Sequence, residues 1–193
     1  MGADLRRIIV VDVEATCWET REEQGDRPNE IIEIGACELI MSTGAIENRI
    51  SIAVAPRFTK VSEFCTKLTG WTQQQIDEEG LTIEEALAAF TENYKPTKET
   101  VWGSFGEYDR WKLSSGHPAG VGKLYGVPYT SNPFELMRSH INIKTFMGLR
   151  FKLKKEMGLD RALTYVKETF DGRPHNGGDD AHNIAKVLRK VMA

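Results

Sequence analysis

Two acidic side chains stand two residues apart at the end of an apolar segment. Asp12 and Glu14 lie in the sequence VVDVEA, directly after the apolar residues 8–11. Residues two apart in an extended strand project to the same side, so we expect both carboxylates to leave the strand together. Two such anions need a compensating cation, or one of them must hold a proton. Oxygen ligands of this kind suit Mg²⁺ or Mn²⁺, although a strand end that turns polar in solvent would give the same pattern.

A histidine and two further acids precede the last segment with helical periodicity. His175 is followed by an asparagine, two glycines, Asp179 and Asp180. Histidine titrates near neutral pH and can therefore move a proton. An aspartate at a helix start is also an ordinary N-cap, so the spacing alone does not decide which acid has a chemical role.

A third acidic position follows a short strand-like segment. Residues 100–103 (TVWG) end in glycine, and Tyr108 and Asp109 come soon after. Asp109 could instead cap the following helix, and Glu107 is a competing acid. Two-metal phosphoryl transfer needs several carboxylates from different elements, with metals roughly 3.5–4 Å apart. Acids at three element ends match that need, since sites in open α/β sheets gather at such ends.

Hydrophobic patterning predicts the elements that must position these groups. The apolar run 8–13 predicts a buried strand. Residues 31–40 and 46–54 predict a hairpin around the turn residues 42–44, and residues 100–103 predict another strand. Together with the helical segments, these strands indicate an α/β domain with a mixed sheet.

Helices are predicted from capping patterns and from apolar periodicity. We expect helices over about 144–157 and 159–169, and a last helix that starts near Asp180, while residues 114–135 are partly irregular. Two capping boxes, each a threonine with a glutamine or glutamate three residues later, mark two further helix starts: Thr72 with Gln75, and Thr82 with Glu85.

Length and composition limit the functional classes. The 193 residues suffice for one α/β domain, which we expect to span 1–193, with 40% apolar and 27% charged residues. No apolar run approaches the ~20 residues of a membrane helix, and no secretory signal is expected. The net charge of −3 argues against a large nucleic-acid footprint, but not against an enzyme that holds a few terminal nucleotides. The spacing of Cys17, Cys37 and Cys65 predicts reduced thiols in a cytoplasmic protein.

Several segments of the chain resemble the DEDDh 3′→5′ exonuclease superfamily (DnaQ-like). Within it, they are similar to the Eri-type branch, which includes histone-mRNA 3′ exonucleases and KapD-like proteins. The resemblance covers nearly the whole chain and implies an RNase H-like fold with a mixed five-stranded sheet flanked by helices. It also implies two divalent cations, Mg²⁺ or Mn²⁺. The segments are VVDVEATCWE (10–19), NEIIEIGACEL (29–39), FCTKLTGWTQQQID (64–77), YDR (108–110), SHINIKT (139–145) and DGRPHNGGDDAHNIAKVL (171–188).

The resemblance assigns catalytic roles to five residues. Asp12 and Glu14 occupy the first motif of the superfamily, Asp109 the second and Asp180 the third, where the spacing favours it over the acid before it. These four carboxylates would hold the metal ions. His175 names the subclass and would act as the general base toward the attacking water.

The resemblance also implies contacts to the terminal nucleotide of the substrate. Backbone contacts fall on the residues after the first acid pair, and a wall against the base and sugar falls on the FCTKLTG segment. Four cations at 150–155 could track the RNA backbone or form a solvated helix face. The implied contact residues are Ala15, Thr16, Phe64, Leu68, Thr69 and Tyr108, and the four cations are Arg150, Lys152, Lys154 and Lys155.

The sequence thus predicts an enzyme that releases nucleoside 5′-monophosphates from the 3′ end of RNA, either single-stranded or in a 3′ overhang. A DNA 3′→5′ exonuclease of the proofreading or repair type is the alternative within the same fold. A non-catalytic RNA-binding module is the alternative from another class, and the presence of all five site residues argues against it. We expect no accessory RNA-binding domain before residue 8, and therefore no specificity for one stem-loop.

Overall fold

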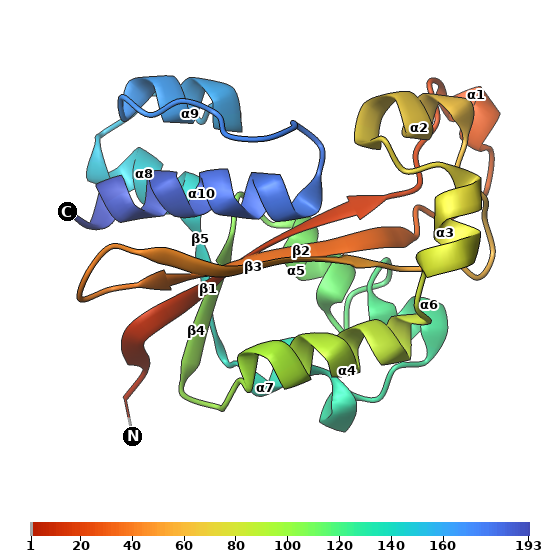
Figure 1. Cartoon of the computed structure of the whole chain (residues 1–193), viewed down its shortest axis with the longest axis horizontal. Coiled ribbons are helices and arrows are strands. Elements are labelled where there is room, and N and C mark those ends of the chain that lie inside the picture. Colours follow the sequence, from red (N-terminus) through yellow and green to blue (C-terminus); the bar gives the residue numbers. More distant parts are fainter. Residues whose placement is uncertain (1) are drawn as a thin grey trace.

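A mixed five-stranded sheet forms the centre of the computed structural model, which describes residues 2–193 (Figure 1). The strand order is β3-β2-β1-β4-β5. β1 pairs antiparallel with β2 and parallel with β4, β2 pairs antiparallel with β3, and β4 pairs parallel with β5. The carboxyl ends of β1, β4 and β5 therefore meet at one edge. The strands are β1 (Asp4–Ala15), β2 (Ile31–Ile40), β3 (Ile46–Ala53), β4 (Thr100–Ser104) and β5 (Ser139–Asn142).

Helices cover both faces of this sheet (Figure 1). α10, α8 and α9 lie on one face, and α4 and α7 lie on the other. The two predicted capping boxes are both present, at the starts of α3 and α4. The helices are α1 (Arg21–Gln24), α2 (Glu63–Thr69), α3 (Gln73–Glu79), α4 (Ile83–Tyr94), α5 (Tyr108–Leu113), α6 (Val121–Tyr125), η1 (Tyr129–Ser131), α7 (Pro133–Leu136), α8 (Ile143–Arg150), α9 (Leu159–Tyr165) and α10 (Gly177–Met192).

Two predicted helices are shorter in the structure than the sequence indicated. The segment expected to be helical over 144–157 stops at Arg150, and Lys152 takes a left-handed conformation with φ +53°. The next helix stops at Tyr165, before Lys167 at φ +61°. Left-handed backbone at a residue other than glycine ends a helix, and the lysine side chains gave no sign of it.

The last helix begins three residues earlier than predicted. Asn176 is its N-cap, and the Asn176 side chain accepts the backbone N–H of Asp179 at 3.1 Å. Asp180 therefore lies within the first turn of α10 and does not cap it. Its carboxylate lies next to Glu14 of β1.

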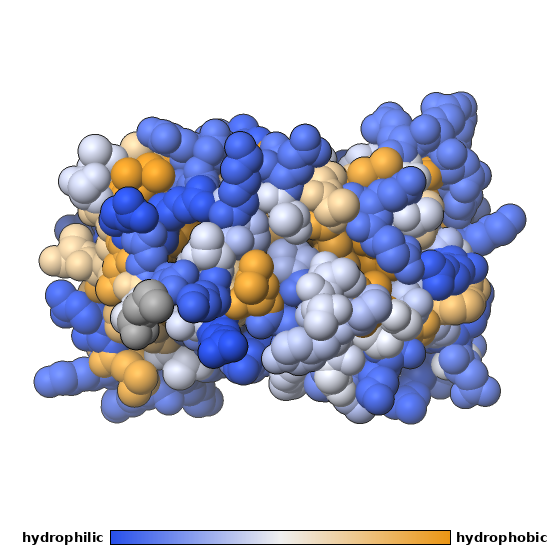
Figure 2. Space-filling model, turned by 90° about the horizontal axis from the view of Figure 1, so that it is seen from below, coloured by the Kyte–Doolittle hydropathy of each residue, from blue (hydrophilic) through white to orange (hydrophobic). Residues whose placement is uncertain are grey.

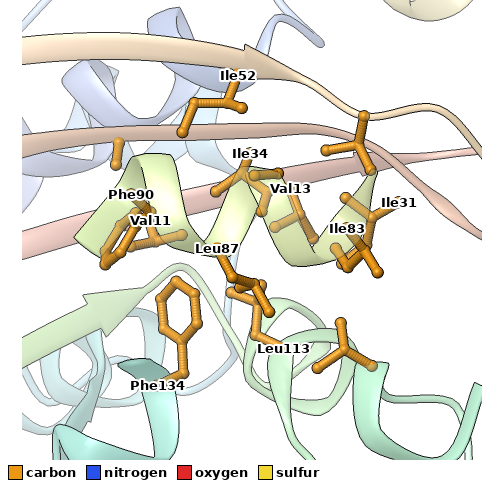
Figure 3. Packing of buried hydrophobic residues seen from close by; sticks show 14 of the residues in the cluster. Val11, Val13, Ile31, Ile34, Ile52, Ile83, Leu87, Phe90, Leu113 and Phe134 are labelled. Atoms are coloured by element: carbon orange, nitrogen blue, oxygen red, sulfur yellow. The ribbon is translucent and has the colours of Figure 1, made fainter. Parts of the chain in front are cut away.

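Two apolar layers hold the helices against the sheet. On β1, Ile9, Val11 and Val13 pack toward α4, whereas Ile8 and Val10 pack toward α10. Figure 3 shows Val11 and Val13 from β1 directed toward Leu87 and Phe90 of α4. Each such side chain contributes roughly 1.5–3 kcal/mol when fully buried. The same alternation places Asp12 and Glu14 on the α10 face.

A close approach of backbone to backbone fixes the start of α10 on the sheet. A Cβ added to Gly35 of β2 would lie 1.8 Å from the carbonyl carbon of Gly177, so no larger residue fits there without movement. Gly177 in turn lies close to the carbonyl oxygen of Asp12, which a Cβ on it would approach to 3.2 Å. The first turn of α10 is thereby set beside the end of β1.

The surface seen from below is largely hydrophilic, with hydrophobic side chains in small patches (Figure 2). Among residues 2–193, no helix combines the length and the apolar character needed to cross a membrane.

Candidate active site

Asp12 and Glu14 lie close together on β1, beside the antiparallel strand β2. In the β1–β2 ladder, Asp12 is paired with Gly35 and Glu14 with Glu33. Because Gly35 has no side chain, the start of α10 comes down over Asp12. As predicted, the two carboxylates leave the strand on the same face, and that face is the one covered by α10.

Asp109 approaches Asp12 and Glu14 from α5, which follows β4 on the side of β1 opposite to β2. It is the second residue of α5, is 6% exposed, and accepts a hydrogen bond from the Val13 N–H at 3.1 Å. The alternative that Asp109 caps the helix is wrong, because Glu107 holds the N-cap position and makes no side-chain cap bond. Glu107 instead accepts a hydrogen bond from the Asn142 amide at 2.9 Å.

The start of α10 supplies the fourth acid and the histidine. The His175 backbone has φ +61°, and its N–H donates to Asp180 Oδ2 at 2.8 Å. Asp179 is held elsewhere, since it lies 3.0 Å from Arg49 Nη1 and accepts the Arg173 N–H. The structure therefore places the Asp180 carboxylate next to Glu14 and directs Asp179 toward Arg49 on β3, which matches the choice of Asp180 made from the motif spacing.

These groups converge, and we call Asp12, Glu14, Asp109 and Asp180 the acid cluster. One ligand atom each from Glu14, His175 and Asp180 lies within 4.8 Å of the others. The His175 Nδ1 atom is 4.0 Å from Glu14 Oε1. The charges of Asp109, Glu14 and Asp180 all act on Asp12, so the four carboxylates lie close together.

The electrostatics of the acid cluster favour a bound cation. Burial, with the charges of the neighbouring acids, holds the pKa of Asp12 well above its usual range. Burial also raises the pKa of Glu14 to about 8, of Asp180 to about 7 and of Asp109 to about 6. Among residues 2–193, no lysine or arginine lies within ion-pair distance of these carboxylates. A donor set of oxygen atoms without its own counter-charge suits a hard divalent cation.

A fifth buried acid was not predicted from the sequence. Glu33 is fully buried, and its carboxylate accepts hydrogen bonds from the Trp71 indole at 2.8 Å and from the Gly178 N–H at 3.4 Å. Its charge helps to raise the pKa of Asp12 and of Glu14. The available signal was a glutamate inside the apolar segment IIEIGA. The fold places this glutamate directly opposite Glu14 in the β1–β2 ladder.

The predicted wall on α2 is only partly exposed to a substrate. Phe64 and Leu68 are half-buried and border a hollow of about 550 Å³. Thr69 is buried, donates its hydroxyl to the Cys65 carbonyl oxygen at 2.9 Å, and accepts the Trp71 N–H. Thr69 thus fixes the end of α2, and the predicted direct contact from it is not supported by its burial.

The two residues after the first acid pair differ in what they can offer. Thr16 is fully buried, and its N–H donates to the Glu30 carbonyl oxygen at 2.8 Å, while its hydroxyl accepts the Glu30 N–H. The predicted backbone contact from Thr16 to a nucleotide is therefore corrected, because that N–H is already used within the protein. Among residues 2–193, the Ala15 N–H donates no hydrogen bond besides those of the sheet itself. The contact from Ala15 to the nucleotide therefore stays a prediction.

Tyr108 presents its ring at the mouth of the acid cluster. The residue is 47% exposed, and Lys112 Nζ lies 5.6 Å from the ring centroid. Desolvation of the hydroxyl, together with the charges of Asp109 and Glu14, holds the pKa of Tyr108 above its ordinary value. A ring in this position is available for stacking against a base.

The four cations predicted to track the RNA backbone are all exposed. They do not form the helix face that the alternative interpretation proposed, because only the first of them lies within α8 and the others follow its end. The four are Arg150, Lys152, Lys154 and Lys155.

Comparison with known proteins gives one family and several relatives. The exonuclease family RNase_T matches residues 9–188. The chain is 30% identical to ERI1 exoribonuclease 2 of Xenopus laevis over 96% of its own length and 28% of that protein. It is 29% identical to 3′-5′ exoribonuclease 1 of Homo sapiens, covering 96% of the chain and 52% of that protein. The chain thus spans about a quarter to half of these relatives.

Solved structures share the fold. The nuclease domain of 3′hExo, a DEDDh family member bound to rAMP, has a TM-score of 0.79 and 27% identity, covering 97% of the chain and 92% of that domain. The predicted RNase H-like exonuclease fold, with a mixed five-stranded sheet flanked by helices, is therefore confirmed.

Proposed function

The chain belongs to the RNase_T exonuclease family, and we propose that it is a 3′→5′ exoribonuclease that releases nucleoside 5′-monophosphates from the 3′ end of RNA. The observation that supports this most strongly is the acid cluster. Its four carboxylates come from three separate parts of the chain, lack a basic partner, and have His175 beside them. Purely structural acids would be expected to pair with lysine or arginine when buried.

We propose that the acid cluster holds two divalent cations, Mg²⁺ or Mn²⁺. The fit rests on the oxygen donors, on their raised pKa values, and on the opening that leaves Glu14 partly exposed. When bound, such ions would lower the pKa of the attacking water and offset negative charge on the leaving 3′ oxygen. Asp12 lies among the other three acids and is the residue best placed to serve both ions.

His175 is the proposed general base. Its side chain is 53% exposed, so its ring can reach a water that attacks at the open side of the acid cluster. The backbone bond from its N–H to Asp180 keeps the residue next to the acids, and Glu14 lies 4.0 Å from Nδ1. The imidazole would take one proton from the attacking water and pass it to solvent, as a neutral histidine can near physiological pH.

The surroundings of the acid cluster suit a single terminal nucleotide. Tyr108 offers an exposed ring near the acid cluster, and Phe64 and Leu68 border a hollow lined by residues of α1 and α2. Stacking on aromatic rings tolerates any base and contributes roughly 1–3 kcal/mol per base. We propose that these residues and Ala15 contact the terminal nucleotide, and that Thr16 and Thr69 support them from within the protein.

We also propose that residues 1–193 work as one exonuclease domain in the cytoplasm. The three cysteines are free in the structure, as expected in a reducing compartment. RNA as the substrate is favoured over DNA by the names of the relatives, and the DNA exonuclease stays as the second candidate.

End-labelled oligonucleotides test this proposal. Single-stranded RNA, DNA of the same sequence, and duplexes with 3′ overhangs, all labelled at the 5′ end, are incubated with Mn²⁺, Mg²⁺ or a chelator. We expect RNA to shorten stepwise from its 3′ end, with mononucleotides as the product, and only when a metal is present. Faster shortening of DNA would favour the second candidate. No hydrolysis in either metal, or cuts inside the chain, would overturn the proposal.

A further inference from the structure

Lys144 is a cation placed next to the acid cluster that the roles given above do not use. It is the second residue of α8, and α8 follows directly after β5. The last residue of β5 pairs with Ser104 at the end of β4. α8 lies on the α10 face of the sheet, which is also the face of Asp12 and Glu14 (Figure 1). Lys144 therefore sits at the sheet edge where the acid cluster forms.

The ammonium of Lys144 lies over the turn that leads to Asp109. Its Nζ atom is 5.2 Å from the ring centroid of Phe105. A Cβ added to Gly106, whose φ is +127°, would be 3.7 Å from the same atom. The Lys144 ammonium thus lies close to this glycine, and the charge of the ammonium lowers the pKa of Asp109 against the effect of burial.

This ammonium forms no ion pair among residues 2–193. Lys144 is half-buried, yet no carboxylate lies within ion-pair distance of it and no hydrogen bond satisfies its Nζ atom. Glu156 and Asp160 border the same hollow, but Glu156 instead accepts the Thr145 hydroxyl at 3.1 Å. An ammonium beside the acid cluster that forms no ion pair keeps its three N–H donors available to an incoming anion.

We propose that Lys144 is a substrate-binding residue that donates to a non-bridging phosphate oxygen at or next to the cleaved linkage of the RNA. The inference rests on the proposed function, because it is the phosphodiester held at the acid cluster that would bring an anion within reach. An ammonium acts as a point charge with rotatable donors and can donate to such an oxygen from several directions. The exposed lysines after α8 lack this position beside Asp109.

A purely structural role is the competing explanation, in which Lys144 only packs over Phe105. The two explanations differ in how binding depends on salt. A lysine that neutralises a phosphate of single-stranded RNA adds about 0.7 to the slope of log affinity against log salt. A lysine that only packs within the protein changes stability and leaves that slope unaltered.

The test measures binding of a single-stranded RNA oligonucleotide over a range of salt concentrations, with Ca²⁺ as the cation and the RNA checked for integrity afterwards. The variants are Lys144→Gln, Lys144→Arg and the matched control Lys98→Gln. Lys98 is an exposed lysine just before β4, at the strand end opposite the acid cluster. The thermal midpoint of each variant without RNA is measured in parallel.

We expect Lys144→Gln to weaken binding about tenfold, the usual effect of losing a charge-assisted hydrogen bond, and to lower the salt slope by about 0.7. Lys144→Arg should restore most of the affinity, and Lys98→Gln should behave as the wild type. An unchanged slope in Lys144→Gln, or equal losses in Lys144→Gln and Lys98→Gln, would overturn the inference. If the inference about Lys144 fails but the wild type hydrolyses RNA, the proposed exoribonuclease function still stands. If the wild type neither binds nor hydrolyses RNA, the proposed function and the inference about Lys144 both fail.

Discussion

At the scale of single residues, His175 holds a backbone conformation that few side chains tolerate. Its φ is +61°, and asparagine adopts this left-handed region more readily than most residues. His175→Asn should therefore keep the backbone bond to Asp180 while it removes the proton acceptor. We expect turnover to fall by roughly 10²–10⁴, the usual contribution of a general base, with little change in the thermal midpoint. Unchanged turnover in steady-state assays would show that the imidazole has no catalytic role.

The carboxylates of the acid cluster make stability depend on pH in a direction opposite to that of ordinary acids. Burial raises the pKa of Asp109 to about 6, of Asp180 to about 7 and of Glu14 to about 8. Unfolded carboxyl groups titrate near pH ~4, so between that pH and the folded values the native state binds more protons than the unfolded state. The metal-free protein should therefore lose stability as pH rises across this window.

Urea denaturation in the presence of a chelator measures this effect. The free energy of unfolding should fall between pH ~4 and pH ~8, and Asp180→Asn should reduce the fall, because the amide does not ionise. Asp77→Asn is the control, since Asp77 is exposed on α3, away from the acid cluster, and its carboxylate accepts a hydrogen bond from the Gln73 amide. A stability that rises with pH over the same window would contradict the account of the acid cluster.

The sequence predicted these residues better than it predicted their neighbours. The acids were visible because their spacing and their motifs are unusual, and the structure brings them together with His175 beside Glu14 and Asp180. Glu33 was missed because a single acid in an apolar strand resembles the polar face of that strand. The hydrogen bonds that occupy Thr16 depend on Glu30 lying opposite the end of β1, which only the folded sheet determines.

At the scale of elements, the contact between β2 and α10 positions the fourth acid. Gly35→Ala would place a methyl group 1.8 Å from the carbonyl carbon of Gly177, so the start of α10 must move. We expect a loss of at least roughly 1–3 kcal/mol in unfolding free energy, as in other overpacked cores, and a large loss of activity. Urea denaturation and RNA hydrolysis measure the two effects.

A second glycine provides the control for that substitution. Gly148 lies in α8, and a Cβ added there would have no atom within 4 Å. Gly148→Ala should leave activity unchanged and stabilise the protein by up to roughly 1 kcal/mol, the difference in helix propensity. If Gly35→Ala were as harmless as Gly148→Ala, the close contact between β2 and α10 would not position the site.

Four of the five strands and the starts of α3 and α4 could be predicted because their signals are local, whereas the patterning did not predict β5. The hairpin of β2 and β3 and both capping boxes follow from neighbouring residues, and the structure confirms them. The ends of α8 and α9 could not be predicted, because lysines with positive φ end them and lysine gives no such signal. The start of α10 was displaced since Asn176, and not an aspartate, caps it.

At the scale of the whole molecule, the topology explains why distant residues meet. β1 is the central strand, with an antiparallel neighbour on one side and a parallel neighbour on the other. Its carboxyl end therefore lies beside the end of β4, which leads to Asp109, and beneath the start of α10, which carries Asp180. The resemblance to DEDDh exonucleases that the motifs indicated is confirmed by the family and by the solved structures.

The net charge of −3 fits a small footprint on RNA. At the acid cluster, bound cations would offset the negative charge of the four carboxylates. A few terminal nucleotides could then be held without a broad basic surface. Lys144 would add one positive charge where the substrate backbone passes.

Isothermal titration of Mn²⁺ into the metal-free protein, in the presence of adenosine 5′-monophosphate at slightly alkaline pH, tests the account most directly. The acid cluster predicts two ions for each wild-type chain, and at least one fewer in both Asp12→Ala and Asp180→Asn, which should remain folded yet lose hydrolysis of RNA. A wild-type chain that binds no Mn²⁺, or an Asp12→Ala variant that keeps both ions and near-normal hydrolysis, would contradict it.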